Sequence, residues 1–385
     1  MNSETCRRIL YCLPTCILIF VAASCRSYQI GQNPASMLKN EHQARGIVLT
    51  ETDVDSLKGL LYYLDFENDY QLDKVIDADV RSIRRFVSYT ATHFLNTGKV
   101  LANFKKLKPA CTAFVCATPG GDVLYARNFD YTADGPSPVV LARTVPENGY
   151  KSVSMISLSL LDYRKGYLSD GKTDVSLLAV APYLLMDGMN EKGLAISVLY
   201  LDPEDSSKNI WYGGTEQYDR QKHDIMTVIA MRMVLDRCSS VQEAIALLDN
   251  YNMFANGKNP KYSYHFLIGD REGNGIVLEY VPIDGKWKMS PVQTNLVTNY
   301  YLSPYLRYVG HGHDRYDEAL QMLKKSQMVL SEEEAMRVLQ AVSQAPAADK
   351  TSNTQWSVIY NLTKRTYLLC VGRKYDMFIR GNLEK

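Results

Sequence analysis

The sequence predicts an α+β protein in which two β-sheets are sandwiched between helical layers. Three observations support this. Strand-like stretches alternate with two separate pairs of helices along the chain. Two Ser-x-x-Glu capping boxes mark helix starts, and no glycine-rich turn leads from a strand into a helix, which argues against a dinucleotide-binding sheet. The 385 residues, 46% of them hydrophobic, suffice for one large domain or two smaller ones.

The first 25 residues are typical of an export signal. Arg7 and Arg8 precede a short apolar run that Pro14 interrupts, and small residues lead into Cys25. The VAASC stretch resembles a bacterial lipoprotein signal and predicts a lipid anchor, hence membrane association, at Cys25. A plain secretory signal and an uncleaved anchor are the alternatives. We therefore expect an extracytoplasmic protein, either a periplasmic or outer-membrane lipoprotein or a secreted one.

Residues 26–110 are predicted to form a linker and a helical pro-segment or small subunit. Residues 26–48 are polar and read as a flexible tether. Two stretches with helical spacing of apolar residues follow, the first over Val54, Leu57, Leu60, Leu61 and Leu64, and the second over Val80, Ile83, Val87, Phe94 and Leu95. A basic linker, KKLKP, ends just before Cys111.

Residues 111–385 are predicted to form the main domain. A Pro-Gly-Gly-Asp turn joins two strands, 112–118 and 123–129, into a hairpin. Further strands are expected at 152–161, 193–200, 262–268, 275–281, 355–360, 365–371 and 377–380. Helices are expected at 224–237, after Ser240, at 314–325 and after Ser331.

Charge and cysteine usage exclude several classes of function. A formal net charge of +1 gives no electrostatic case for nucleic acid. Outside the signal, Cys111, Cys116, Cys238 and Cys370 remain, enough for two disulfides but without metal-ligand spacing. The GHGHD segment at 310–314 is interpreted as a polar turn before a helix rather than a metal site. We expect no metal and no organic cofactor.

Cys111 is the candidate nucleophile. A thiolate needs a base, and none of the six histidines lies in a motif that would supply one. If Cys111 were the first residue of a mature chain, its own α-amine, with a pKa of roughly 7.7–8.0, would accept the thiol proton. This mechanism requires cleavage of the peptide bond between Ala110 and Cys111.

Five ordered motifs, covering about residues 111–380, carry a family resemblance. CTAFVCATPGGDVLYARNFDY resembles the opening of the choloylglycine hydrolase and acid ceramidase families, which include the N-acylethanolamine acid amidases. These are N-terminal-nucleophile amidases. The other motifs are DGMNEKGLAISVLY (187–200), LVTNYYLSP (296–304), DRYDEAL (314–320) and TQWSVIYNLTKRTYLL (354–369). The resemblance implies a four-layer αββα sandwich and hydrolysis of linear amide bonds.

The resemblance also implies roles for individual residues. Cys111 would be the nucleophile, Arg127 would position the thiolate, and Asp130 would hold the α-amine. The side-chain amide of Asn299 and the backbone N–H of Asn190 would form the oxyanion hole. Arg315 would complete the charge network around the cysteine. Alternatives remain open: Arg127 and Asp130 as a structural ion pair, both asparagines as turn residues, Cys116 as the nucleophile, and Arg307 in place of Arg315.

The expected substrate is a small N-acyl amide with an apolar acyl group, such as a bile-salt conjugate, an N-acylethanolamine or a ceramide-like lipid. From their positions, Phe114, Tyr131 and Tyr300 are candidates for lining the acyl pocket. The family resemblance is compatible with a homo-oligomer. Two other functions remain open: an acyltransferase that uses the same acyl-enzyme, and a non-catalytic surface lipoprotein that binds acyl ligands.

Overall fold

The structure is a computed structural model, and all of its described residues fall within Asn33–Lys385. It describes residues 47–67, 69–80, 82–90, 92–93, 110–131, 136–161, 163–170, 172, 175–202, 204–205, 210–211, 219, 221–254, 263–346 and 352–384. The predicted signal and tether therefore lie outside the described residues, apart from the last two tether residues.

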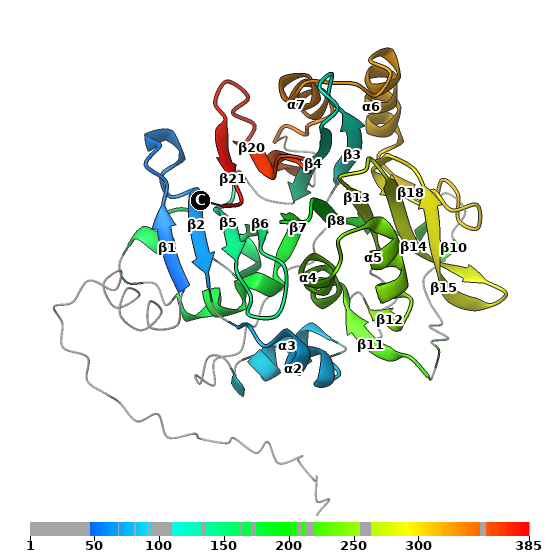
Figure 1. Cartoon of the computed structure of the whole chain (residues 1–385), viewed down its shortest axis with the longest axis horizontal. Helices are drawn as coiled ribbons and strands as arrows, with labels where there is room; N and C mark the ends of the chain where they lie inside the picture. The colour runs from blue at the N-terminus through cyan, green and yellow to red at the C-terminus, as the bar shows by residue number, and fades with distance from the viewer. Residues whose placement is uncertain are drawn as a thin grey trace, which may run out of the picture. The chain divides into compact units, whose positions relative to one another are not determined.

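A nine-stranded sheet forms one of the two central layers (Figure 1). Every neighbouring pair in it is antiparallel except β2 and β5, which are parallel. In spatial order its strands are β1 (Ile47–Glu51), β2 (Leu61–Phe66), β5 (Val139–Thr144), β6 (Ser152–Ser157), β7 (Leu185–Asn190), β8 (Leu194–Leu201), β13 (Ser263–Asp270), β14 (Gly275–Ile283) and β15 (Lys286–Gln293).

A six-stranded antiparallel sheet forms the second central layer and contains the predicted hairpin. Its order is β16 (Leu296–Val297), β3 (Thr112–Ala117), β4 (Val123–Tyr131), β19 (Asn353–Asn361), β20 (Thr366–Val371) and β21 (Ile379–Asn382). The shorter pairs are β9 (Glu204–Asp205) with β10 (Ile210–Trp211), β11 (His223–Met226) with β12 (Tyr251–Phe254), and β17 (Asn299–Tyr300) with β18 (Gly310–His311).

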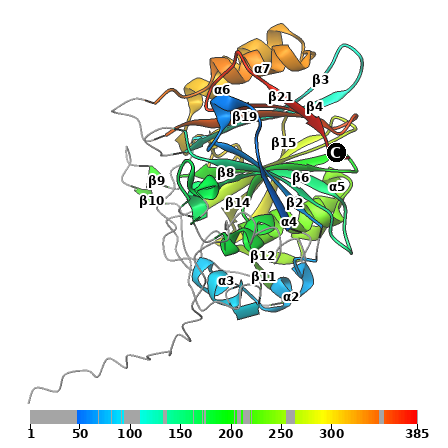
Figure 2. The same ribbon diagram turned by 90° about the vertical axis from the view of Figure 1, so that its left-hand side faces the viewer.

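Two helix pairs cover the outer faces of the sheets (Figure 2). Helices α4 (Thr227–Arg237) and α5 (Val241–Leu248) contact the nine-stranded sheet, and α6 (His313–Lys325) and α7 (Glu332–Ala341) contact the six-stranded one. Ser240 caps α5, and Ser331 with Glu334 forms a complete capping box on α7, as expected. The predicted four-layer αββα sandwich is confirmed.

The remaining helical elements are short. Helix α2 (Leu72–Asp77) contacts α4, and α3 (Ile83–Thr90) follows it in the chain. Among the described residues, the 3₁₀ segments are η2 (Asp55–Leu57), η4 (Leu158–Leu161), η5 (Tyr167–Ser169) and η6 (Ser176–Tyr183). Among the described residues, no helix combines the length and the apolar character that crossing a membrane requires.

The helix predicted over residues 54–64 is wrong. Gly59 adopts a left-handed backbone conformation, with φ at +74°, and ends the single 3₁₀ turn. Leu61–Phe66 then forms β2, which is rich in tyrosine and pairs in parallel with β5. The same apolar spacing fits either element, so tertiary pairing decides. The second predicted helix is confirmed as α3, whereas Phe94 and Leu95 lie outside the described residues.

Strand alternation divides the hairpin between two hydrophobic cores. Cys111, Ala113 and Val115 lie in the core between the sheets. Phe114 and Cys116 lie in a second core, together with side chains from α6 and α7. Successive side chains of a strand point to opposite faces, so the hairpin directs odd-numbered residues of β3 towards the nine-stranded sheet.

Candidate active site

Cys111 lies immediately before β3 and is fully buried. Its Sγ accepts a hydrogen bond from Nη2 of Arg127 at 3.3 Å. Burial raises the pKa of the Cys111 thiol, and the positive charge of Arg127 opposes this increase. The four cysteines 111, 116, 238 and 370 are all free, so the two disulfides that the count allowed do not form.

Arg127 is held beside the thiol from strand β4 by contacts with the other sheet. Its Nη2 also donates to the carbonyl of Val198 on β8 at 2.7 Å, and its Nε lies 3.5 Å from Oδ2 of Asp187 on β7. Both side chains are completely buried. Facing strands therefore fix the guanidinium, which places a cation at the sulfur within a region of low dielectric constant.

Asp187 is a site residue that the sequence analysis did not identify as such. Trp356 donates to its Oδ2 at 3.0 Å and Tyr360 to its Oδ1 at 2.7 Å. Burial raises the pKa of Asp187 to about 6, although the charge of Arg127 acts in the opposite direction. A signal was present, because Asp187 opens the DGMNEKGL motif and is a carboxylate in a strand of mostly apolar residues.

Arg315 on α6 and Asn299 on β17 lie close to the backbone of Cys111. Nη1 of Arg315 donates to the Cys111 carbonyl at 2.6 Å and to the Thr112 hydroxyl at 2.9 Å, and its Nη2 donates to Oδ1 of Asn299 at 2.9 Å. Nδ2 of Asn299 donates to the Tyr200 carbonyl at 2.8 Å. These bonds orient the Asn299 amide next to the cysteine backbone, where the oxyanion hole is predicted.

Gly312 makes room for Arg315. It precedes α6 with φ at +84°, and a Cβ at this position would lie 2.3 Å from Nη2 of Arg315. The GHGHD segment leads into the helix as expected, but Gly310–His311 form β18 rather than a turn. The rival Arg307 is exposed, and its guanidinium lies over the Tyr308 ring.

A buried histidine supports the segment that carries Asn299. His265 on β13 bridges Oε1 of Glu279 at 3.1 Å and the carbonyl of Thr298 at 2.8 Å. Glu279 in turn accepts hydrogen bonds from the backbone N–H groups of Leu302 and Ser303, both at 2.8 Å. The carbonyl next to Asn299 is thus tied to the nine-stranded sheet.

Asp130 lies near the end of β4, at the open end of the hairpin, beside the peptide bond that precedes Cys111. Its Oδ1 accepts from the Thr354 hydroxyl at 2.6 Å and its Oδ2 accepts from Nε2 of Gln344 at 2.7 Å. Its backbone carbonyl accepts from the N–H of Ala110 at 3.2 Å. Burial raises the pKa of Asp130, and the charge of Arg315 opposes this. Gln344 lies outside every motif, so the sequence contained no signal for it.

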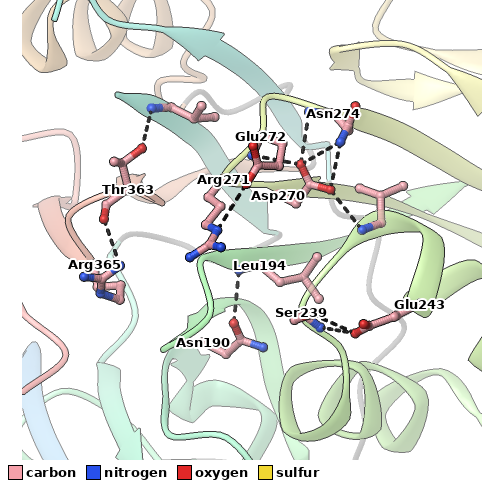
Figure 3. A network of polar contacts seen from close by, with 12 residues as sticks. Asn190, Leu194, Ser239, Glu243, Asp270, Arg271, Glu272, Asn274, Thr363 and Arg365 are labelled. Carbon is pink, nitrogen blue, oxygen red and sulfur yellow. Dashed lines mark hydrogen bonds and ion pairs between the residues drawn. The ribbon is translucent and has the colours of Figure 1, made fainter. Parts of the chain in front are cut away.

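The structure does not bring Asn190 to this cluster, so its predicted place in the oxyanion hole is wrong. Its side chain shapes the β7–β8 turn, where Oδ1 accepts from the N–H of Leu194 (Figure 3). Oδ1 also accepts from the N–H of Lys192, and Nδ2 donates to the carbonyls of Leu235 and Cys238. Leu194 precedes Val198 by four strand residues, which is roughly 13 Å along β8. The turn interpretation, weighed for this residue, is the correct one.

The structure also corrects part of the predicted acyl pocket. Phe114 points away from Cys111 into the core under α6 and α7, because strand alternation places it on the other face. Tyr131 is buried at the end of β4 in the core between the sheets. Tyr300, next to Asn299, stacks on His313 with ring centroids 4.1 Å apart.

Cys116 and a hollow at the sheet edge are both separate from the site. Burial raises the pKa of Cys116 to about 12, and its neighbours are apolar, which fits a core residue. A hollow of about 540 Å³ is lined by the sheet-edge residues Tyr63, Arg143, Tyr367 and Arg380 among others, and by none of the predicted site residues.

Comparison with known proteins finds a family model and solved structures that resemble part of the chain. Residues 111–299 match the linear amide C–N hydrolases of the choloylglycine hydrolase family. The structure is similar to a variant of conjugated bile acid hydrolase from Clostridium perfringens, with a TM-score of 0.50 at 17% identity over 71% of this chain and 93% of that chain. It also matches penicillin V acylase from Agrobacterium tumefaciens, with a TM-score of 0.49 at 20% identity over 71% and 87% of the two chains. No curated protein sequence matches the chain significantly.

Proposed function

We propose that Cys111 is the N-terminal nucleophile of an extracytoplasmic N-acyl amide hydrolase, because residues 111–299 match the linear amide C–N hydrolases of the choloylglycine hydrolase family. The observation that carries this proposal is the convergence of two buried arginines, Arg127 and Arg315, on one buried thiol residue. No histidine is among the side chains that contact Cys111 in the described part of the chain. The base is therefore assigned to the α-amine of Cys111.

The α-amine becomes available when the Ala110–Cys111 bond is cleaved. A free α-amine has a pKa of roughly 7.7–8.0, so a useful fraction is neutral near neutral pH and accepts the thiol proton. Asp130, on the adjacent strand end, then holds the resulting ammonium group. Arg127 stabilises the thiolate that attacks the amide carbonyl.

The remaining groups serve the later steps of the reaction. The Asn299 amide, oriented by Tyr200 and Arg315, stabilises the oxyanion of the tetrahedral intermediate. The α-ammonium protonates the leaving amine, and water hydrolyses the thioester. Asp187 keeps Arg127 in place throughout and does not contact the reacting atoms.

For the substrate we propose an N-acyl amide with an apolar acyl group. One structural relative acts, by its name, on conjugated bile acids. Tyr131 at the end of β4 directly follows Asp130, and Tyr300 directly follows Asn299. We assign them to the acyl side, without Phe114.

We further propose that the segment before Cys111 stays bound after cleavage as a small subunit. Strand β2 pairs with β5 inside the nine-stranded sheet, so its loss would expose a sheet edge. The Tyr70 hydroxyl donates to the buried Asp236 at 2.5 Å, and Asp236 also pairs with Arg232. Export through residues 1–25 and a lipid anchor at Cys25 complete the proposal for localisation.

The test is the intact mass and N-terminal sequence of purified wild-type protein and of Cys111→Ala. We expect a wild-type fragment that starts at Cys111, co-eluting with the small subunit, and an uncut Cys111→Ala chain. Amide hydrolysis is then assayed on conjugated bile acids, penicillin V and N-acylethanolamines. An uncut, stable wild-type chain without amidase activity would instead favour an acyl-ligand-binding protein. An aminolysis product formed with an added amine would indicate acyl transfer.

A further inference from the structure

Gln344 contacts the peptide bond whose cleavage the proposed function requires. It follows α7, and its Nε2 donates to the carbonyl oxygen of Ala110 at 3.0 Å. That oxygen belongs to the bond between Ala110 and Cys111. The same Nε2 donates to Oδ2 of Asp130 at 2.7 Å. One primary amide thus binds both the carbonyl to be attacked and the carboxylate beside it.

The orientation of this amide is determined by charge. An amide nitrogen has two hydrogens to donate, and both acceptors around it are oxygens. The flipped amide would place its own oxygen against a carboxylate and a carbonyl, which is repulsive. The side chain must therefore present its donor to the Ala110 carbonyl.

The backbone of Gln344 is held by the residue that also binds Asp130. The N–H of Gln344 donates to the Thr354 hydroxyl at 2.8 Å, and the N–H of Thr354 donates to the Gln344 carbonyl at 2.9 Å. The Thr354 hydroxyl donates to Asp130 at 2.6 Å. This closed ring fixes Gln344 relative to the hairpin end, so its donor is preorganised and does not depend on a mobile side chain.

We propose that Gln344 is a catalytic residue of self-cleavage, in which its side-chain amide stabilises the oxyanion that forms on the Ala110 carbonyl. This inference rests on the proposed function, because it assumes that Cys111 cleaves the bond before it. Donors that stabilise such oxyanions lie 2.7–3.1 Å from the oxygen, and the 3.0 Å contact of Gln344 falls within this range.

The reaction proceeds as an acyl shift followed by hydrolysis. The Cys111 sulfur adds to the carbonyl carbon of Ala110, and the negative charge on the carbonyl oxygen is met by Gln344. When the carbon–nitrogen bond breaks, the thiol proton passes to the departing nitrogen, which leaves a thioester and a free α-amine. Water then hydrolyses the thioester, which forms the Ala110 carboxylate and returns the thiol.

The experiment follows cleavage of the full chain after cell-free translation, by intact mass at timed intervals. The variants are Gln344→Met, which has similar volume but no donor, and Gln344→Glu, measured at pH 8. The matched control is Gln355→Met, because Gln355 is a buried glutamine that bonds Ser137 and Asn353 instead. We expect both Gln344 variants to cleave roughly 10²-fold more slowly than wild type, and the control to cleave within about threefold of it.

Added hydroxylamine distinguishes the acyl shift from the hydrolysis of the thioester. It cleaves a thioester that has already formed, so it should not rescue Gln344→Met if the amide stabilises the first oxyanion. Rescue by hydroxylamine, or cleavage of either folded Gln344 variant at the wild-type rate, would overturn the inference. If Gln344→Met alone fails to fold, as judged by melting in a Cys111→Ala background, Gln344→Glu decides. A wild-type chain that stays uncut refutes the proposed function itself, which is a different result.

Discussion

Cys111 directly precedes β3 and Cys116 lies on it, five residues later; both are buried, yet only Cys111 has charged groups beside it. Around Cys111 are Arg127, Arg315 and the end of β4 with Asp130. Cys116 packs in the second core among apolar side chains. Burial raises the pKa of both thiols, but only Cys111 has cations that oppose the increase. The comparison shows that a reactive thiol is defined by the groups that the fold brings to it.

The largest expected effect on cleavage and amidase activity comes from removing the thiol of Cys111. Cys111→Ala should leave the chain uncut and lower amidase activity on the order of 10⁴-fold or more, because the nucleophile of both reactions is lost. Intact mass and kcat/KM measure this. Cleavage of the alanine variant at Ala110 would show that an outside protease acts and that the two thiols differ less than their surroundings suggest.

A smaller effect is expected when the cation beside Cys111 is loosened, which makes the surroundings of Cys111 more like those of Cys116. Asp187→Asn removes the carboxylate that holds Arg127, so kcat should fall by about 10- to 100-fold while KM changes little. Circular dichroism and melting of the variant serve as the control for folding. Equal kcat values in both proteins would mean that Val198 alone fixes the guanidinium.

The contact between Asp187 and Arg127 predicts a dependence of activity on pH. Asp187 has a pKa of about 6 in the fold, so it gains a proton below pH 6 and releases its hold on Arg127; activity should therefore fall on the acid side of about pH 6. The pKa is raised on folding, so this group's contribution to stability is complete at low pH and declines as pH rises to about 6. The acid limb of kcat/KM should disappear in Asp187→Asn. A limb that persists unchanged would assign it to another group.

Displacing Arg315 should lower activity less than removing the carboxylate that holds Arg127. In Gly312→Ala, the new Cβ would lie 2.3 Å from Nη2 of Arg315, in addition to the strain of a positive φ. We expect activity to fall about 5- to 20-fold, with a loss of stability of about 2 kcal/mol. Gly285→Ala is the matched control, since its φ is +70° and nothing lies within 4 Å of the new Cβ. Equal activity losses in the two variants would remove Arg315 from the site.

The smallest effect is expected at the other thiol. Cys116→Val roughly conserves volume in an apolar core, so the free energy of unfolding should change by less than about 1.5 kcal/mol. Cleavage and kcat should remain within about twofold of wild type. A large loss of activity in a folded Cys116→Val protein would contradict the division of the hairpin into two faces.

Much of the fold was predictable because local patterns and tertiary pairing agree in it. The Pro-Gly-Gly-Asp turn specifies the β3–β4 hairpin, and the box at Ser331 specifies the start of α7. Prediction failed for 54–64, where apolar spacing fits both a helix and a turn followed by a strand. There the partner strand β5, more than 70 residues away in sequence, decides the outcome.

By itself, the sequence determined the layered architecture, the nucleophile candidate and the placing of Arg127, Asp130, Asn299 and Arg315 near it, because ordered motifs carry these. Only the tertiary structure decided three further points. Asn190 serves a turn, Phe114 faces the helices, and Asp187 and Gln344 approach from other elements. The physical reason is that contacts across the two sheets join residues far apart in sequence, and no local pattern encodes which side chains meet there.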